Sequence, residues 1–576
     1  MEAAIPDSSA LTTRLSDAPT STKRFWVLVV LTGALGGGSA AGLVSFMRWL
    51  QHLAWGGAGE GFLHAVADVS WARRLMIPLG AGVLVTIASI ALRQPLRGHG
   101  TAGIIESIWT RSGKMTLWRT LIRALVSITA VALGAPLGRE GALLQTGAAS
   151  ASWLGTRLKV SPDQLRLLVG CGAAAGIAAA YNVPIGAALF GLEVLLGSFA
   201  LELFGPIVLA CVVATLVSRV LIADHPTYLI PHYKLATRME FALPLLLGPL
   251  IGVASAAYVK TIQSFAAALE HVPRAISWFL PVFAMLAVGL AATWYPELLG
   301  NGYDTVNLAL LGKLSLTLLI ALPLLKMVAT ATAAGAGVPG GLFTPSLFFG
   351  ALLGGSFGML AHHFFPSVQP GTYALLGMGG VLAGTTHASV SAILMIFELT
   401  GNYDVVLPLM LVCVASNAVS RAIHPDSLYT GVLRKRNVPV PGGVQPGWLT
   451  ARPVGSLMTE SLETVSATAP IHEVLADLLE LPPGHDLYVV HPDGRFAGVV
   501  LLDAVKAYLP DHSLLRDSTA RDVMRAESPI LREASLSEAA ARFAHSSRMD
   551  RLPVVDARGR LVGVLGKSEV LKQARF

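Results

Sequence analysis

The chain has 576 residues, of which 53% are hydrophobic and only 13% are charged, and its net charge is +7. Soluble globular proteins carry about 25% charged residues, so this composition excludes a soluble globular protein and indicates that lipid surrounds most of the chain. The positive charge does not indicate nucleic-acid binding, because the basic residues lie mainly at the ends of apolar segments, as in membrane proteins.

Residues 1–24 are expected to form a polar cytoplasmic tail, because they are rich in Ser, Thr and Ala and lack the apolar core and cleavage site of a signal peptide. Lys23 and Arg24 directly precede the first apolar segment, and three basic residues, 434–436, follow the last one. The positive-inside rule therefore predicts that both termini are cytoplasmic. The compact loops favour the plasma membrane of a prokaryote.

Apolar segments recur over residues 25–437, and several approach the roughly 20 residues that span a bilayer as a helix. Others are short and interrupted by glycine, which is typical of transporters whose broken helices meet inside the membrane. The sequence predicts an all-α polytopic membrane domain over this range. The clearest apolar segments are 25–50, 75–92, 121–133, 203–220, 241–259, 279–294, 314–334 and 405–419.

The membrane segment also repeats internally. VLACVVATLVSRVL in the first half aligns without gaps on MLVCVASNAVSRAI in the second, and Glu193 matches Glu398 just upstream. We therefore expect two repeats, of about residues 25–222 and 240–437, with a binding site at the midplane where they meet. Hydropathy leaves open whether the repeats are parallel or inverted.

Three glycine-rich loops interrupt the apolar sequence: GHGTA (98–102), GREGA (138–142) and GGLFTP (340–345). Each precedes a helical pattern, and a helix N-terminus offers free N–H groups and a positive dipole end to an anion. Non-helical backbone at membrane depth is tolerated where protein buries it or where it lines a cavity. The loops predict one dehydrated anion site, although such interruptions also serve helix packing.

Glu140 lies inside one of these loops, and an ionisable residue in a membrane segment is costly to bury and functional by default. A carboxylate beside an anion site can occupy the site when it is ionised and leave when it is protonated. The alternative is an ion pair with Arg139, but adjacent residues on a helix do not face each other. We therefore predict that Glu140 is a gate sensitive to protons and anions.

Composition changes near residue 437, where a Pro- and Gly-rich stretch over 438–453 reads as a linker. Two similar units follow, over 454–512 and 518–576. Each ends as a strand, an Asp/Gly turn, a second strand and a helix: LYVV–HPDG–RFAGVVLL with VKAYL, and LPVV–DARG–RLVGVLG with SEVLKQ. The pattern predicts a pair of small α+β domains.

The order GHGTA, GREGALLQTG, GAAAGIAAAYNVPIGAALFGLE, GGLFTP and SLYTGVL resembles the CLC family of chloride channels and chloride/proton antiporters, and the terminal units resemble CBS domains. The resemblance implies an all-helical inverted-repeat fold, a homodimer with one pathway per subunit, and chloride as the bound ligand with no required cofactor. It implies gating by Glu140, and anion binding by the amides of Leu342 and Phe343 and the hydroxyl of Tyr429. The other anion-binding residues that we predict lie in the loops: His99, Gly100, Arg139 and Gly141.

The first loop departs from the GSGIP sequence usual in the family, because His99 stands in the Ser position and Ala102 in the Pro position; Ala142 likewise replaces the Pro of GREGP. His99 can donate an N–H to the anion, and we expect a protonated His99 to strengthen binding. Alternatively, its side chain turns aside to a backbone carbonyl and its loop amide takes the role of the Ser. Both readings stay open.

A second departure bears on mechanism. Antiporters of the family usually carry a proton-passing glutamate directly after the position of Glu193, and this chain has Val194 there. The difference favours uncoupled, channel-like conduction. The alternative is a chloride/proton antiporter with a non-standard internal route, for which the candidate residues are Glu140, Glu193, Glu202 and His99.

The nucleotide-binding pattern of CBS domains is degenerate in both units, with Asp503 one residue early in the first and Glu569 at the acid position of the second. Adenine nucleotide binding therefore competes with a structural or dimerising role. A CBS-containing cation transporter is a further alternative, but it would need several intramembrane carboxylates. Another is a membrane-anchored nucleotide sensor, which would not explain Glu140 inside a membrane segment. No hydrolase motif occurs in the apolar segments, and the three cysteines lack metal-ligand spacing, so we expect neither an enzyme nor a metal site.

Overall fold

The computed structural model describes residues 23–573 with internal gaps, in two compact units that divide near residue 442. His99, Asp503 and nearly all of the expected linker lie outside the described residues, as does the helix expected after residue 505. The gaps are 57–60, 95, 97–99, 223–227, 229, 232, 234–238, 437, 439–452, 461, 482–485, 502–504, 506–517, 535 and 546–549.

The described part of the first unit is helical throughout, apart from turns and loops, and every apolar segment predicted above falls on a helix. The helices of its first half are α2 (Lys23–Trp55), α3 (Phe62–Asp68), α4 (Trp71–Ala91), α5 (Gly100–Thr110), α6 (Leu117–Ala132), α7 (Glu140–Arg157), α8 (Pro162–Tyr181), α9 (Pro184–Phe190), the π-helix η1 (Gly191–Leu196) and α10 (Leu201–Ile222).

The second half continues the helical pattern to the end of the unit. Its helices are α11 (Met239–Glu270), α12 (Arg274–Ser277), α13 (Leu280–Ala292), the 3₁₀ turn η2 (Pro296–Leu298), α14 (Tyr303–Leu310), α15 (Leu316–Ala336), α16 (Phe343–Phe364), α17 (Pro370–Thr386), α18 (Ser389–Thr400), α19 (Val406–Ile423) and α20 (Thr430–Lys435).

Eight helices of the described chain are long and apolar enough to cross a membrane, and they differ in how deeply they lie. In α8 and α16, 89% and 78% of the apolar stretch is buried, against 33% in α4 and α19. Glycine permits this central packing: a side chain at Gly147 of α7 would collide with the backbone carbonyl of Gly172 in α8. The Gly- and Ala-rich helices therefore form the centre, and the Leu- and Val-rich helices face outward.

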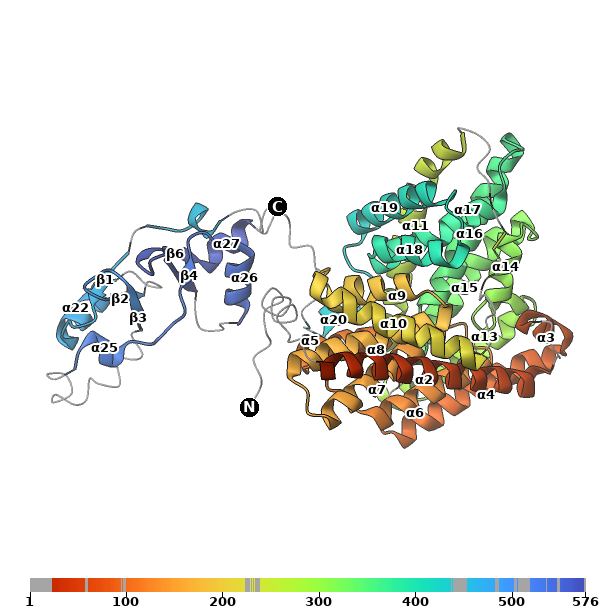
Figure 1. The fold of residues 1–576 in the computed structure, drawn as a ribbon, viewed down its shortest axis with the longest axis horizontal. Helices are drawn as coiled ribbons and strands as arrows, with labels where there is room; N and C mark the ends of the chain where they lie inside the picture. The colour runs from red at the N-terminus through yellow and green to blue at the C-terminus, as the bar shows by residue number, and fades with distance from the viewer. Residues whose placement is uncertain are drawn as a thin grey trace. The chain divides into compact units, whose positions relative to one another are not determined.

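The two halves use corresponding helices in corresponding contacts. Helix α7 packs on α8, which packs on α10; in the second half α16 packs on α17, which packs on α19 (Figure 1). The helices α10 and α19 carry the aligned sequences identified above, so the repeat in the sequence is a repeat in the structure. The halves meet where α9 packs on α18.

The second unit contains two three-stranded sheets of identical topology. In each sheet the second strand runs antiparallel to the third, as the repeated strand–turn–strand sequence predicts, and the first strand, which was not predicted, runs parallel to the second. The elements are β1 (Thr464–Ser466), α22 (Ile471–Glu480), β2 (Leu487–Val490) and β3 (Phe496–Val500), then α25 (Ala520–Val523), β4 (Ile530–Leu531), α26 (Leu536–His545), β5 (Arg551–Val555), β6 (Leu561–Gly566) and α27 (Lys567–Gln573).

Candidate functional site

Two of the three glycine-rich loops meet backbone to backbone. Gly138 and Gly341 form an isolated antiparallel bridge, in which the Gly138 amide donates to the Gly341 carbonyl at 2.8 Å and the Gly341 amide donates back at 2.7 Å. Helix α7 begins at Glu140 within GREGA, and α16 begins at Phe343 within GGLFTP. The bridge therefore holds the N-termini of two corresponding helices, one from each half, beside each other inside the unit.

The Glu140 carboxylate lies across this bridge. Its Oε1 accepts hydrogen bonds from the Thr344 amide at 2.9 Å and from the Tyr181 hydroxyl at 2.5 Å, while its Oε2 has no hydrogen-bond partner among the described residues. A side chain at Gly138 or Gly341 would collide with the carboxylate and displace it, so glycine at both positions leaves room for Glu140 to lie across the bridge. A carboxylate of the first half thus accepts a hydrogen bond from an N-terminal amide of α16 in the second half. Free amides and the helix dipole favour a negative group at this position.

A small cavity adjoins this carboxylate and has a volume of about 10 Å³, which is room for roughly one water molecule. Rings form much of its wall: Phe190 lies edge-on to both Phe343 and Tyr429, with ring centroids 6.2 Å apart in each pair. The polar groups that line it come from Glu140, Thr101, Tyr181 and Tyr429, and its apolar wall is completed by Leu144 and Ile177.

Thr101 is a cavity residue that the sequence analysis missed. It is buried in the first turn of α5, which starts at Gly100, and it lines the cavity together with Tyr429. The usable signal was a hydroxyl residue inside the GHGTA loop, two positions after His99. Since His99 lies outside the described residues, Thr101 is the hydroxyl of this loop that the structure places beside the cavity.

An ion pair joins helix α5, which carries Thr101, to the end of α20, which Tyr429 precedes. Glu106 of α5 forms ion pairs with Arg111 at 2.6 Å and with Arg436, just after α20, at 2.8 Å. Tyr429 itself directly precedes α20, and its neighbour Leu428 donates its amide to the Thr385 carbonyl of α17. The cavity wall is therefore held from both halves of the unit.

The remaining predicted acids lie elsewhere. The Glu193 carboxylate in η1 accepts the Ser391 amide at 2.8 Å and the Ser391 hydroxyl at 2.6 Å, at the start of α18. Reciprocally, Glu398 at the end of α18 accepts the amides of Ile185 and Gly186, at the start of α9. Each half thus caps a helix of the other. Glu202 is exposed in the first turn of α10, and neither Glu193 nor Glu202 lines the cavity beside Glu140.

This cross-capping makes a prediction about Glu193. Replacing Glu193 with Ala is expected to lower the free energy of unfolding by about 1 kcal/mol, because a helix loses its N-terminal cap. Glu193→Gln keeps one acceptor oxygen and is expected to retain both stability and anion flux. Thermal unfolding in detergent and flux in liposomes measure the two quantities. If Glu193→Gln instead abolished linked proton movement while leaving stability intact, Glu193 would be a proton carrier.

In the terminal unit, Glu569 accepts a hydrogen bond from the Gly566 amide at 3.0 Å, three residues before it, at the start of α27. This contact caps its own helix. The carboxylate that was weighed as a nucleotide ligand is therefore engaged by the backbone, and its predicted partner Asp503 lies outside the described residues.

The chain matches known families over most of both units. Residues 80–421 match the model of the voltage gated chloride channel family, and residues 454–511 and 520–575 match the CBS domain. A putative ClcB-like chloride channel protein of Ralstonia nicotianae is 36% identical over 422 residues, which cover 71% of this chain and 97% of that protein. The voltage-gated ClC-type chloride channel ClcB of Escherichia coli K12 is 32% identical over 412 residues, covering 70% and 97%.

Solved structures show the same fold. A slow cyanobacterial Cl⁻/H⁺ antiporter superposes with a TM-score of 0.65 at 23% identity, over 72% of this chain and 99% of that one. A eukaryotic CLC transporter superposes with a TM-score of 0.62 at 19% identity, over 95% and 98%. A CLC-type fluoride/proton antiporter gives a TM-score of 0.59 at 20% identity, over 70% and 96%.

The broken helices and the helix N-termini that meet inside the apolar unit define an integral membrane protein of the class that transports ions. The chain belongs to the CLC family, with a pair of CBS domains after its membrane domain. Members of this family are anion channels and transporters and not enzymes, and the predicted fold class is confirmed.

Proposed function

We propose that this protein conducts chloride through a passive pathway that the Glu140 carboxylate closes. The observation that carries the proposal is the place of that carboxylate: it holds the Thr344 amide at a buried helix N-terminus and lines the same cavity as Tyr429. A chloride ion binds to the same kinds of donor, a backbone amide and a hydroxyl group. Carboxylate and chloride therefore compete for one position, and protonation or displacement of Glu140 opens it.

The anion ligands follow from the same geometry. Leu342 and Phe343 lie at the start of α16, where amides lack acceptors within the helix. The loop backbones at Gly100 and Gly141 approach each other closely, and the hydroxyls of Thr101 and Tyr429 face the cavity. We include Arg139, whose charge lies next to Glu140 in the chain; His99 lies outside the described residues and stays a prediction from the sequence. Tyr429 favours chloride over fluoride, as in chloride-type members that the sequence resembles.

Passive conduction is supported by the residues around η1. Val194 is buried and apolar, and Glu193 is engaged in capping α18. A chain of carboxylates from Glu140 to Glu202 is not formed by the described residues. The competing function is chloride/proton antiport. One solved structure of this fold is named a Cl⁻/H⁺ antiporter and another a fluoride/proton antiporter.

We also propose a homodimer in a prokaryotic plasma membrane with both termini in the cytoplasm. The corresponding helices α10 and α19 expose apolar side chains, among them Leu216 and Val220 on the first and Leu407 and Val414 on the second. Lys23 and Arg24 at one end and Arg434 at the other support the orientation. We assign the CBS pair a structural role, with nucleotide binding as the alternative.

Chloride release from liposomes tests the proposed activity. Purified full-length protein is reconstituted in vesicles loaded with potassium chloride, diluted into a low-chloride buffer, and triggered with a potassium ionophore. We expect fast chloride release that empty vesicles lack, with sodium and fluoride moving far more slowly. Cation flux, or release no faster than from empty vesicles, would contradict the proposal.

Thr101→Val removes the hydroxyl of α5 from the cavity at nearly constant volume. Since a hydrogen bond to a charged group contributes roughly 1.5 kcal/mol or more, we expect the chloride concentration for half-maximal flux to rise about tenfold. Thr110→Val, on the same helix but bonded to the Glu106 carbonyl, is the matched control. An unchanged chloride dependence in Thr101→Val would remove Thr101 from the site.

A further inference from the structure

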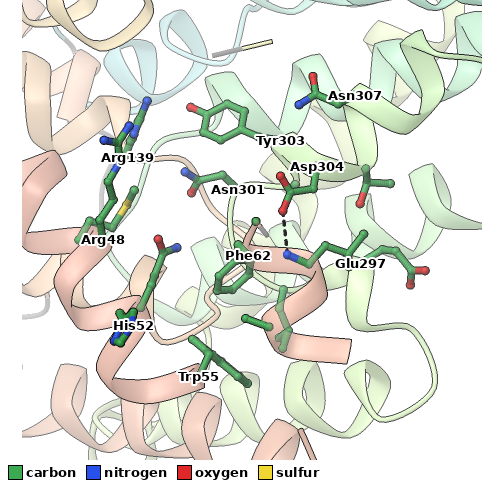
Figure 2. Close-up of a pocket in the computed structure, with 18 of the residues that line it drawn as sticks. Arg48, His52, Trp55, Phe62, Arg139, Glu297, Asn301, Tyr303, Asp304 and Asn307 are labelled. Carbon is green, nitrogen blue, oxygen red and sulfur yellow. Dashed lines mark hydrogen bonds between the residues drawn. The ribbon is translucent and has the colours of Figure 1, made fainter. Parts of the chain in front are cut away.

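A second, much larger cavity lies near the end of α2 that is remote from Lys23, with a volume of about 690 Å³. Figure 2 shows side chains of α2, the loop before α14 and α14 itself around it. At roughly 30 Å³ per water molecule, the space accommodates an ion with its hydration shell. It is separate from the small cavity that holds the Tyr429 hydroxyl.

Helix α2 presents a polar face to this cavity. Arg48, Gln51, His52 and Trp55 line it at helical spacings of three and four residues, at the end of a helix that is otherwise apolar. An arginine in a membrane helix characteristically faces a water-filled cavity and marks an ion pathway. Helical periodicity therefore aims the charge of Arg48 at this space.

The cavity also receives the side chain of Arg139, the residue before Glu140. Arg139 is 6% exposed; one guanidinium nitrogen donates to the Ala180 carbonyl at 3.2 Å, and its buried Nε has no hydrogen-bond partner in the part of the chain that the structure describes. It stacks on the Tyr303 ring, 5.2 Å from the centroid. Figure 2 shows the side chains of Arg48 and Arg139 next to each other.

The acidic groups that line the cavity do not neutralise this pair. Asp304 accepts the Leu63 amide at 2.7 Å and thereby caps α3, on the opposite wall. Glu297 lies farther along the same wall (Figure 2). Neither forms an ion pair with Arg48 or Arg139 among the described residues. The Arg48 and Arg139 guanidinium groups therefore face the cavity without an ion pair to either of its acidic residues, and guanidinium groups bind anions through directed N–H donors.

Hydroxyl groups connect this site to the buried carboxylate. The Tyr303 hydroxyl, under Arg139, lies 3.4 Å from the Thr344 hydroxyl and 3.5 Å from that of Tyr181. Tyr181 in turn donates to Glu140. An ion held at the arginine pair is thus connected to the position of Glu140 through the hydroxyl groups of Tyr303 and Tyr181.

We propose that Arg48 and Arg139 form a binding site for a small hydrated monovalent inorganic anion, from which the pathway is loaded. The assignment rests on the proposed anion transport. Arg48 supplies the charge that is specific to this outer site, since Arg139 also lies beside the gate. The site raises the local anion concentration before the ion sheds its water and displaces Glu140.

Chloride titration of Arg48→Gln tests the site. Initial uptake into liposomes is measured against external chloride, with gluconate holding ionic strength constant. Loss of one unit charge at about 5 Å from the ion is expected to raise half-saturating chloride about three- to fivefold and to leave maximal uptake unchanged. Arg48→Lys, which keeps the charge, is expected to shift less. Arg73→Gln, which removes a charge outside the cavity lining, is the control.

The outcomes separate the two claims. If the unmodified protein takes up chloride and Arg48→Gln matches it at every concentration, the loading site is wrong and the proposed function stands. A lower maximal rate at unchanged half-saturation would also overturn the site, because it would mean that Arg48 only supports the structure. If the unmodified protein takes up no chloride, the proposed function fails, and the site fails with it.

Discussion

Glu140→Gln is expected to raise chloride flux at neutral pH about tenfold and to remove its pH dependence. Glutamine keeps the shape of the side chain but loses the charge that competes with chloride for the Thr344 amide. A charge-assisted hydrogen bond is roughly twice as strong as a neutral one, a difference of about 1.4 kcal/mol, which corresponds to a factor of ten. Displacement of the side chain by chloride therefore becomes easier by that factor.

The pH profile gives this prediction its sharpest form. In the unmodified protein, protonation of Glu140 removes its charge, so flux is expected to rise as the pH falls. In Glu140→Gln the profile is expected to be flat. Glu398→Gln is the matched control, because Glu398 is also a carboxylate at a helix N-terminus but does not line the cavity. Retention of the acid-stimulated profile in Glu140→Gln would show that another group gates the pathway.

Lys326→Met is expected to lower the free energy of unfolding by about 3 kcal/mol, because it leaves two buried acceptors unpaired. Lys326 lies in α15 and is 1% exposed. Its Nζ donates to the Leu298 carbonyl at 2.7 Å and to the Gly300 carbonyl at 2.8 Å, and lies 5.2 Å from the centre of the Phe348 ring. These bonds fasten the loop that leads into α14 and the outer cavity.

Thermal unfolding in detergent measures this effect, with Lys313→Met as the control because Lys313 is exposed. We expect a drop of several degrees for Lys326→Met and almost none for the control. Methionine fills much of the space of lysine, so the difference reports the lost donor more than a cavity. Equal unfolding temperatures for the two variants would show that the loop does not depend on Lys326.

The hydropathy of the sequence predicted the outer helices of the membrane domain but not the central helices. The segments predicted as apolar fall on helices, whereas α8 and α16 were not singled out. Their sequences are rich in Gly and Ala, and their most apolar stretches are less hydrophobic than that of α10. Helices packed between other helices need small residues for close approach more than they need apolar bulk. The strands of the terminal unit were readable because short alternating segments flank clear turns.

The site was predictable where the residues of a loop directly determine its backbone conformation. GREGA and GGLFTP place Glu140 beside the α16 N-terminus because their glycines permit the backbone bridge. Thr101 was not predicted, because His99 and not Thr101 stands in the family's Ser position. The exchange of caps between Glu193 and Glu398 joins segments about 200 residues apart, and no local pattern reveals it. Arg48 was not singled out, because it lies inside the segment 25–50 that was predicted as apolar.

Simultaneous recording of chloride and protons tests the central claim most directly. Liposomes containing the purified protein are given a chloride gradient, and external chloride and external pH are followed together, with Glu140→Gln in parallel. We predict chloride flux without linked proton movement in both proteins, and faster flux in the variant. Chloride flux that drives protons against their gradient in the unmodified protein, and loses that coupling in Glu140→Gln, would contradict passive conduction and establish an antiporter.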